Sequence, residues 1–356
     1  MKPMVPVPAE VLSELTTQLL QDAGMPESDA AQAADVLVSA DLRGVDTHGV
    51  SHMLRVYLGW LASGMVNATP AVRTVRERPG AATLDADRGI GVVVAPMAMR
   101  MAIEKAASVG VGLVTINNSR HLGMAAYHAM MALPHRMIGI CTSAVGPLVV
   151  PTFAAEPRLG TNPIAVAAPS GAQPPFVFDA AMSAIAGNRI PLSHRLGKPL
   201  PAGTIADEHG TPIMTPQAAT ADYASARLLP LGSTRETGSH KGYGLAMVAE
   251  ILSSVLSGSR FIFELGTGNA AHAVMAVDVA AFVEPEEFIR TMDDYLLTMR
   301  STPPAPGHER VLYAGLLEDE TERVRRNEGI PLHPEVVAWL DGAAAAADRP
   351  TLSRRL

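Results

Sequence analysis

The sequence predicts a two-part α/β fold, and its length and periodicity are the observations behind this prediction. With 356 residues, the chain is longer than one small hydrophobic core usually organises and suits two domains. Residues 1–75 read as helices, whereas from about Ala81 short β-rich runs alternate with helical stretches. Because such alternation is typical of helices packed on a sheet, we expect a helical unit over 1–75 and an α/β domain over 76–303. Helical patterns return in 304–356, and we expect this segment to join the first unit.

Three helices are expected in the amino-terminal unit. The first spans about Ala9 to Ala23 and ends before Gly24, a common residue after a helix C-terminus. The second starts at Ser28, since serine is a good N-cap. The third covers Thr47 to Ala62. The carboxyl-terminal helices are expected to pack against these three.

The α/β domain is read from short β-rich runs and the helical stretches between them. The expected strands are 82–84, 111–116, 137–142, 163–168 and 176–178. Helices are expected over 92–108, 124–133 and 243–256, and in the carboxyl-terminal segment over 318–327 and 334–346. The segment 197–235 is rich in Pro, Gly, Thr and Asp and is expected to run over the surface without regular structure.

Composition and charge exclude several function classes. A net charge of −7 opposes binding to nucleic acid or to anionic membranes, and 4% aromatic residues leave little for base-stacking platforms. The single cysteine, Cys141, cannot form an intrachain disulfide and fits a reducing compartment. No apolar run reaches the ~20 residues of a membrane span, and the amino terminus lacks the apolar core of a signal peptide. We therefore expect a cytoplasmic protein whose ligands are small molecules.

The common nucleotide and nucleophile motifs are missing. The string closest to G-x-G-x-x-G, at residues 89–94, lacks the third glycine, so an ordinary Rossmann phosphate loop is not indicated. There is no P-loop, no H-E-x-x-H and no G-x-S-x-G either. A dinucleotide would have to bind by other means.

Two histidines and an arginine share one face of the third expected helix. On an α-helix His48, His52 and Arg55 fall within about 60° of each other, opposite an apolar arc. Thr47 or Asp46 can cap the helix. Imidazoles and a guanidinium near a helix N-terminus suit a carboxylate. The alternatives are a solvated polar face, or a metal held by His48 and His52, for which the sequence offers no obvious third ligand.

A further histidine follows the buried strand expected at 111–116. His121 lies in the loop beyond the carboxyl end of that strand, where open α/β sheets gather their ligands. Imidazole titrates near neutral pH and suits proton exchange with a hydroxyl or carbonyl oxygen. A lone loop histidine is often ordinary polar surface, but the neighbouring Asn117, Asn118, Ser119 and Arg120 favour a site.

Three later loops have the chemistry of a cofactor site. Gly160-Thr161-Asn162 precedes a strand, and small residues there let backbone approach a ligand closely. Asp179, at the end of the next strand, can accept a ribose hydroxyl. Lys241 opens a long apolar helix, where a phosphate or a ribose edge can bind. Each string alone is equally consistent with ordinary turn chemistry.

Together these strings resemble the malate/L-lactate dehydrogenase family, whose fold is not the Rossmann fold. The resemblance runs from Ala40-Asp41-Leu42-Arg43-Gly44 to Gly329-Ile330-Pro331-Leu332. It implies a homodimer in which a helical domain is joined to a nicotinamide-binding α/β domain with a mixed sheet. The active site is expected between the two domains.

The resemblance also implies roles for individual residues. His121 corresponds to the acid/base, and His48 to the histidine of a Ser-His-Gly motif in which Thr47 replaces the serine. The cofactor contacts correspond to Asp179, Ala180, Ala181 and Lys241, and by position Val145 and Gly160-Thr161-Asn162 join them. No metal is implied.

Two departures concern the substrate. The family usually has an arginine four residues after the motif histidine, to clamp the substrate carboxylate, and here that position is His52. Either Arg55, nearly one turn further on, substitutes for it, or the substrate differs. Arg120 is also unusual beside the catalytic histidine.

The sequence thus predicts an oxidoreductase that uses NAD or NADP. Its hydride is expected to move between the cofactor and C2 of a small 2-hydroxy or 2-oxo acid. Within the same family the alternative is reduction of a cyclic imine-2-carboxylate. Alternatives of another class are a metal-dependent lyase or hydrolase that uses His48 and His52, and a non-catalytic binding protein.

Overall fold

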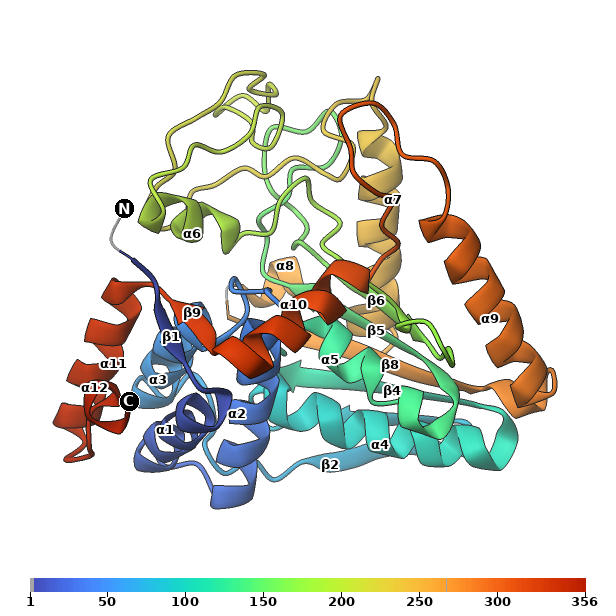
Figure 1. The fold of residues 1–356 in the computed structure, drawn as a ribbon, viewed down its shortest axis with the longest axis horizontal. Coiled ribbons are helices and arrows are strands. Elements are labelled where there is room, and N and C mark those ends of the chain that lie inside the picture. Colours follow the sequence, from blue (N-terminus) through green and yellow to red (C-terminus); the bar gives the residue numbers. More distant parts are fainter. Residues whose placement is uncertain (1–2, 267) are drawn as a thin grey trace.

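The centre of the molecule is a seven-stranded mixed sheet. The computed structural model describes residues 3–266 and 268–356 and places the strands in the order β2-β3-β4-β8-β5-β6-β7 (Figure 1). Only β3 and β4 run parallel, and every other neighbouring pair is antiparallel. The strands are β2 (Arg73–Arg78), β3 (Ala81–Asp85), β4 (Val111–Ser119), β5 (Met137–Val145), β6 (Ile164–Ala168), β7 (Phe176–Ala180) and β8 (Ala270–Asp278). The prediction of an α/β domain with a mixed sheet is confirmed.

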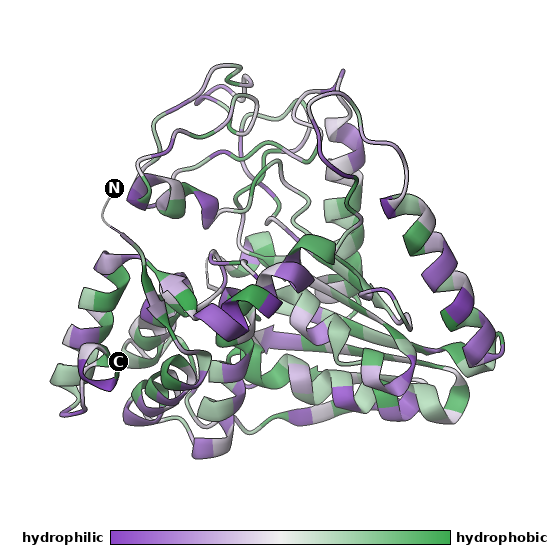
Figure 2. Ribbon diagram, viewed as in Figure 1, coloured by the Kyte–Doolittle hydropathy of each residue, from purple (hydrophilic) through white to green (hydrophobic). Residues whose placement is uncertain are grey.

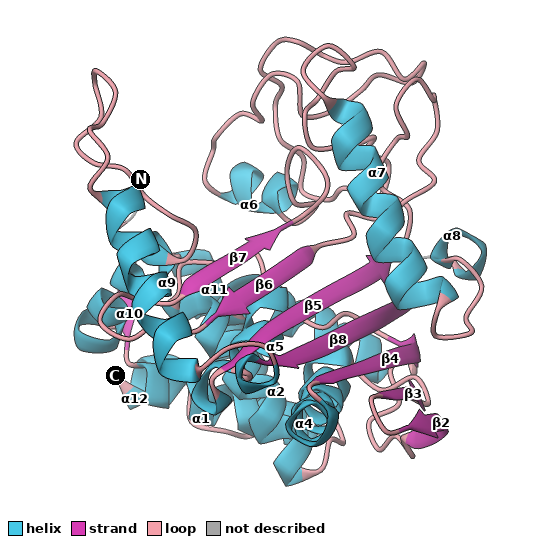
Figure 3. Ribbon diagram, turned by 90° about the vertical axis from the view of Figure 1, so that its right-hand side faces the viewer, coloured by secondary structure: helices cyan, strands magenta, loops and turns pink. Residues whose placement is uncertain are grey.

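Helices cover both faces of this sheet (Figure 3). On one face lie α4 (Gly91–Val109) and α5 (Ala125–Met130), and two strand glycines allow their close approach. A Cβ at Gly112 would lie 2.0 Å from the carbonyl oxygen of Ala102 in α4, and one at Gly139 equally close to that of Ala129 in α5. On the other face lies α7 (Ser239–Glu250), which continues as a π-helical turn, η3 (Ile251–Val255), where Ser253 hydrogen-bonds Thr142 of β5 at 2.8 Å.

The two ends of the chain meet in one helical layer (Figure 1). This layer contains α1 (Ala9–Asp22), α2 (Glu27–Leu42), the π-helical η1 (Val50–Leu54), α3 (Arg55–Ala62), α10 (Leu316–Glu328), α11 (Pro334–Ala346) and α12 (Leu352–Arg355). Strand β1 (Val5–Val7) pairs with β9 (Ile330–Leu332), and Leu12 and Leu37 share a buried core with Leu340 and Leu352. These contacts favour grouping 304–356 with 1–75, and the exact domain boundaries stay a prediction.

The remaining segments cap the sheet. The chain between β7 and α7 has one short helix, α6 (Arg189–Arg195), and otherwise isolated bridges around a small core of Val149, Ile190, Leu200 and Leu228. The loop expected over 197–235 is therefore present. The other short elements are η2 (Leu133–His135), α8 (Ile262–Leu265), η4 (Val279–Ala281) and the longer α9 (Pro285–Arg300). Figure 2 shows hydrophobic and hydrophilic residues alternating along α9 and α10, as expected for helices that cover a core on one side.

Some elements were missed and two predicted helix starts were wrong. The central strand β8 and the helix α9 were not expected at all. The second helix begins at Glu27, with Pro26 rather than Ser28 at the N-cap position. The third expected helix is a turn at 46–48 followed by η1 and α3, so its start is not a regular α-helix. Among the described residues, no helix combines the length and apolarity that crossing a bilayer requires.

Candidate active site

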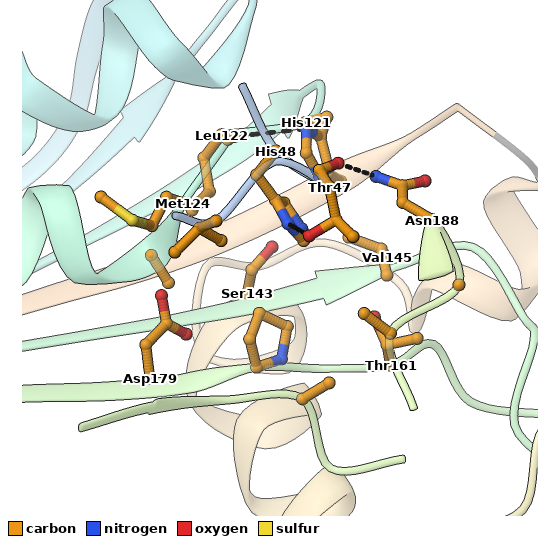
Figure 4. Close-up of a pocket in the computed structure, with 18 of the residues that line it drawn as sticks. Thr47, His48, His121, Leu122, Met124, Ser143, Val145, Thr161, Asp179 and Asn188 are labelled. Carbon is orange, nitrogen blue, oxygen red and sulfur yellow. Dashed lines mark hydrogen bonds between the residues drawn. The ribbon is translucent and has the colours of Figure 1, made fainter. Parts of the chain in front are cut away.

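A cavity of about 710 Å³ lies where the helical layer meets the edge of the sheet at which β4 and β5 end. This volume is typical of small-molecule sites. Thr47 and His48 line it from the helical layer, and Ser143, Thr161 and Asp179 from the sheet side (Figure 4). Trp60 of α3 also belongs to the lining. The site therefore depends on contact between the two parts of the fold.

His48 and His121 form the centre of the cavity wall. Their rings are stacked, with centroids 5.5 Å apart. Nδ1 of His121 lies 2.8 Å from the hydroxyl of Tyr57 and accepts a hydrogen bond from the Gly123 N–H at 3.2 Å. When Nδ1 accepts both bonds, the hydrogen of the neutral ring is on Nε2, which has no partner among the described residues and is free for a bound molecule.

Tyr57 supports His121 in both protonation states. The tyrosine is fully buried in α3, and its hydroxyl can donate to or accept from Nδ1. When Nδ1 carries no hydrogen the hydroxyl donates to it, and when Nδ1 is protonated, in the other neutral tautomer or in the imidazolium, the phenolic oxygen accepts. A proton can therefore come and go at Nε2 without leaving Nδ1 unpaired.

Two further buried histidines hold the peptide on either side of His121. Nε2 of His272, in β8, donates to the carbonyl of Arg120 at 2.9 Å, and Nε2 of His128, in α5, donates to the carbonyl of Leu122 at 2.8 Å. Both imidazoles are completely buried. Because burial disfavours the charged form, the pKa of His272 falls to about 3 and that of His128 to about 4, so both stay neutral donors near pH 7.

His48 is positioned by a carboxylate beneath it. Oδ2 of Asp41, in α2, accepts the backbone N–H of Val50 at 2.7 Å, and Ser51 donates its hydroxyl to Oδ1 at 3.2 Å. Gly49 packs directly on this carboxylate, since a Cβ there would lie 2.0 Å from Oδ1. The expected caps, Thr47 and Asp46, do not perform this role: Thr47 instead hydrogen-bonds Nδ1 of His48 at 2.8 Å.

The two cavity histidines are neutral in the free protein. Burial lowers the pKa of His48 to about 4, and nearby His52 adds to this effect. Burial also holds the pKa of His121 well below its usual value, with His48 as the next cause. A bound anion would reverse part of this shift, because a nearby negative charge favours imidazolium.

Asp179 forms the acidic side of the cavity. Its Oδ2 accepts the N–H of Ala126 at 2.7 Å, in the first turn of α5. Asp179 is exposed to the cavity, but the protein atoms packed around its carboxyl group still raise its pKa to about 6, and Glu318, which also lines the cavity, contributes. The group is thus mostly ionised at pH 7 and can accept hydroxyl hydrogens.

Comparison with known proteins agrees with this geometry. A family model described as malate/L-lactate dehydrogenase matches residues 7–341. The chain belongs to the malate/L-lactate dehydrogenase family. Malate dehydrogenase of Pyrococcus horikoshii is 39% identical over 345 residues, which cover 95% of this chain and 94% of the relative. L-sulfolactate dehydrogenase of Methanocaldococcus jannaschii is 34% identical over 325 residues, which cover 90% of each chain.

A solved structure has the same fold over nearly the whole chain. Malate dehydrogenase from Entamoeba histolytica superposes with a TM-score of 0.93 at 35% identity, covering 98% of this chain and 99% of that one. The resemblance stated from the sequence is confirmed. The protein is an oxidoreductase that acts on CH–OH groups and belongs among the hydroxy acid dehydrogenases.

The cavity of this dehydrogenase collects about half of the residues proposed from the sequence. Those that line it are Thr47, His48, His121, Val145, Thr161, Asp179 and Ala181. Those that do not are His52, Arg55, Arg120, Gly160, Asn162, Ala180 and Lys241. Asn162 is buried and connects the end of β5 to α7, since it accepts the Val145 N–H and donates to Glu250. Lys241 lies exposed in the first turn of α7.

None of the three residues proposed to bind the substrate carboxylate lines the cavity of this dehydrogenase, and two of them are bound to other groups. Arg55 pairs with Glu335 at 2.6 Å and lies over the ring of Trp339. Arg120 turns back along the chain, where Nε donates to the carbonyl of Met65 at 3.1 Å. His52 lies within η1, where a π-helical turn replaces the regular α-helix on which its projection beside His48 was based.

Several residues around the dehydrogenase site were not proposed from the sequence. Arg43 lines the cavity, as do Ser143, Asn188 and Glu318. Asn188 donates to the carbonyl of Thr47 at 3.0 Å. Arg43 lies inside the first string of the family resemblance, which was a usable signal, whereas nothing in the local sequence marks Asn188. Within residues 3–266 and 268–356, no three His, Cys, Asp or Glu side chains form a possible metal site.

Proposed function

We propose that this enzyme transfers a hydride between a nicotinamide cofactor, NAD or NADP, and C2 of a small 2-hydroxy or 2-oxo acid. The observation that carries the proposal is the His48–His121 pair at a cavity wall, with Nε2 of His121 left without a protein partner. An imidazole so placed is within reach of a substrate oxygen and can exchange a proton with it.

The residues present fit such a cofactor. The cavity wall contains many small residues, among them Ala181, Ala186, Gly187 and Gly315, which allow a flat ring or a sugar to approach the backbone. Asp179 and Glu318 offer carboxylate oxygens to ribose hydroxyls. The bound cofactor would supply or accept the hydride.

The chain's own residues do the rest of the chemistry. In reduction the His121 imidazolium passes its Nε2 proton to the C2 oxygen and is left neutral, with its remaining hydrogen on Nδ1 donated to the Tyr57 oxygen. In oxidation Nε2 of this neutral tautomer takes the proton back. His48, locked by Thr47, stacks against His121 and fixes the orientation of its ring. His272 and His128 fix the backbone of the same loop, so the reacting nitrogen is held in place before the substrate arrives.

A spectrophotometric screen tests this function. The purified enzyme is incubated with NADH or NADPH and a panel of 2-oxo acids and cyclic imine-2-carboxylates, and absorbance is followed at the nicotinamide band. We expect turnover with at least one 2-oxo acid. Turnover with cyclic imines alone would move the substrate class to the imine alternative. Binding of both cofactors without turnover on any member would contradict the proposal.

We also propose that the enzyme is a cytoplasmic homodimer. Its free Cys141 is buried, as suits a reducing compartment. Along α7 and η3 a row of apolar side chains is exposed, namely Leu245, Val248, Ile251 and Val255. Their exposed fractions run from 43% to 52%, and such a stripe is typical of a protein interface.

If the apolar stripe on α7 and η3 forms the dimer interface, charged side chains placed in it should separate the protomers. Val248→Glu combined with Ile251→Glu should convert the dimer to a monomer in light scattering, because two buried carboxylates per protomer would face each other across the interface. Val75→Glu, on the exposed strand β2, is the matched control and should leave the mass unchanged. A wild-type protein that is already monomeric at micromolar concentration would contradict this proposal.

A further inference from the structure

We infer that the substrate carries a single carboxylate and an uncharged apolar group at C3, rather than a second anionic group. This inference rests on the proposed function and narrows its substrate class. It concerns a difference from malate, the dicarboxylate named in the relative from Pyrococcus horikoshii. Three independent features of the site support it: its charge, the pairing of nearby cations and the character of its walls.

The cavity has more acidic than basic side chains. Among the described residues that line it, the carboxylates are Asp179, Asp222 and Glu318, and the single guanidinium is Arg43. With both histidines neutral, the lining has a formal charge of 1 − 3 = −2. Arg43 is itself paired with Glu322 at 2.9 Å. The described lining therefore offers one permanent cation, which is already ion-paired, and has none to spare for a second substrate anion.

The other cations near the site are held by groups outside it. Arg195 lies 3.0 Å from Oε2 of Glu335, whose other oxygen binds Arg55 at 2.6 Å. Neither arginine lines the cavity, and neither does Arg120, which donates to backbone carbonyls. Recruiting one of them would break an existing ion pair or hydrogen bond.

The walls next to the histidine pair are apolar. Trp60 packs against Tyr57, the partner of His121, with ring centroids 5.8 Å apart. The carbonyl of Met65 binds Arg120, the residue before His121, and the Met65 side chain lines the cavity. Val56 and Leu148 also line it. A carboxylate against such a surface would lose its hydration without gaining a partner, whereas a branched alkyl group would gain contacts.

A matched substrate pair tests the inference. Oxaloacetate and 4-methyl-2-oxopentanoate have side chains of the same shape, CH₂–COO⁻ and CH₂–CH(CH₃)₂, and differ in charge. We expect kcat/KM to be at least tenfold higher for 4-methyl-2-oxopentanoate, about 1.4 kcal/mol of discrimination. An equal or higher value for oxaloacetate would overturn the inference and leave the proposed function intact. Failure to reduce any 2-oxo acid would instead remove the proposed function, and the inference with it.

A cation added to the wall provides a second test with the same pair. Met65→Lys places an ammonium in the cavity lining and should raise kcat/KM for oxaloacetate relative to 4-methyl-2-oxopentanoate by at least tenfold. Val75→Lys adds the same charge on the exposed strand β2, away from the cavity lining, and should leave the ratio unchanged. If Met65→Lys leaves the ratio unchanged too, charge in the cavity does not set specificity and the inference is wrong.

Discussion

Replacing His121 with glutamine is expected to lower kcat by about 10²-fold or more, the range for loss of a general acid/base. Glutamine can still hydrogen-bond Tyr57, so the loop should stay folded while the titrating nitrogen at the cavity is lost. Cofactor affinity, measured by fluorescence titration, should change little, because the effect lies in proton transfer. Steady-state kinetics with a deuterated hydride donor would show whether hydride transfer limits the rate.

Tyr57→Phe is the control for this experiment. It removes only the partner of Nδ1 and leaves the Gly123 N–H in place, so turnover should fall less than in the glutamine variant. Near wild-type turnover in His121→Gln, with hydride transfer rate-limiting, would remove His121 from its proposed role.

The kcat/KM of the wild type for oxidation is expected to fall at acidic pH. Oxidation of a hydroxy acid needs His121 neutral with Nε2 unprotonated and the ring hydrogen on Nδ1, so that Nε2 can take the proton. Because burial holds the pKa of His121 in the free protein well below its ordinary value, the neutral form persists as the pH falls below 6.5. The kcat/KM for oxidation should therefore be level from neutral to mildly acidic pH and fall only below that. This ratio reports the free enzyme, whereas kcat reports the complex, in which a bound carboxylate raises the pKa.

The position of His121 could be predicted because it depends on local signals. The buried run from Val111 predicts a strand, and the polar cluster after it predicts a loop at the sheet edge. In the structure β4 ends at Ser119, and His121 follows at the cavity. His48 could also be predicted from local sequence, because the Thr47-His48-Gly49 motif lies on one short segment.

The substrate roles of His52 and Arg55 stay a prediction, but the α-helical geometry on which they were based is wrong because the segment contains a π-helical turn. Projecting His48, His52 and Arg55 onto an α-helix brings them to one face, but the observed segment widens to i→i+5 spacing over Val50–Leu54. His48 also precedes that turn. The pairing of Arg55 with Glu335, 280 residues further on, has no local signal at all.

The central strand β8 was missed for a compositional reason. Its first residues, Ala270, Ala271, His272 and Ala273, are not β-branched or aromatic, so strand propensity is low. The segment is a strand because β4 and β5 pair with it on both sides and bury it. Missing β8 also hid His272, whose contact with the loop of His121 exists only through that pairing.

Gly49→Ala adds one methyl group and is expected to destabilise the active-site segment more than any other such substitution there. The new Cβ would lie 2.0 Å from Oδ1 and 2.2 Å from Cγ of Asp41, and it cannot be accommodated without moving a buried carboxylate. That carboxylate holds the N–H of Val50, so the turn that carries His48 must shift as well. We expect a loss of about 2–4 kcal/mol in the free energy of unfolding, measured by urea denaturation, together with a large fall in kcat/KM.

Gly59→Ala separates this clash from a general effect of alanine. Gly59 lies inside α3, and a Cβ there would meet no atom within 4 Å. Its replacement should raise stability by up to about 1 kcal/mol, since alanine favours the helix and restricts the unfolded chain. If both variants unfold at the same urea concentration as the wild type, Asp41 does not pack beneath the His48 turn. In that case the histidine pair must be held in place by contacts other than these.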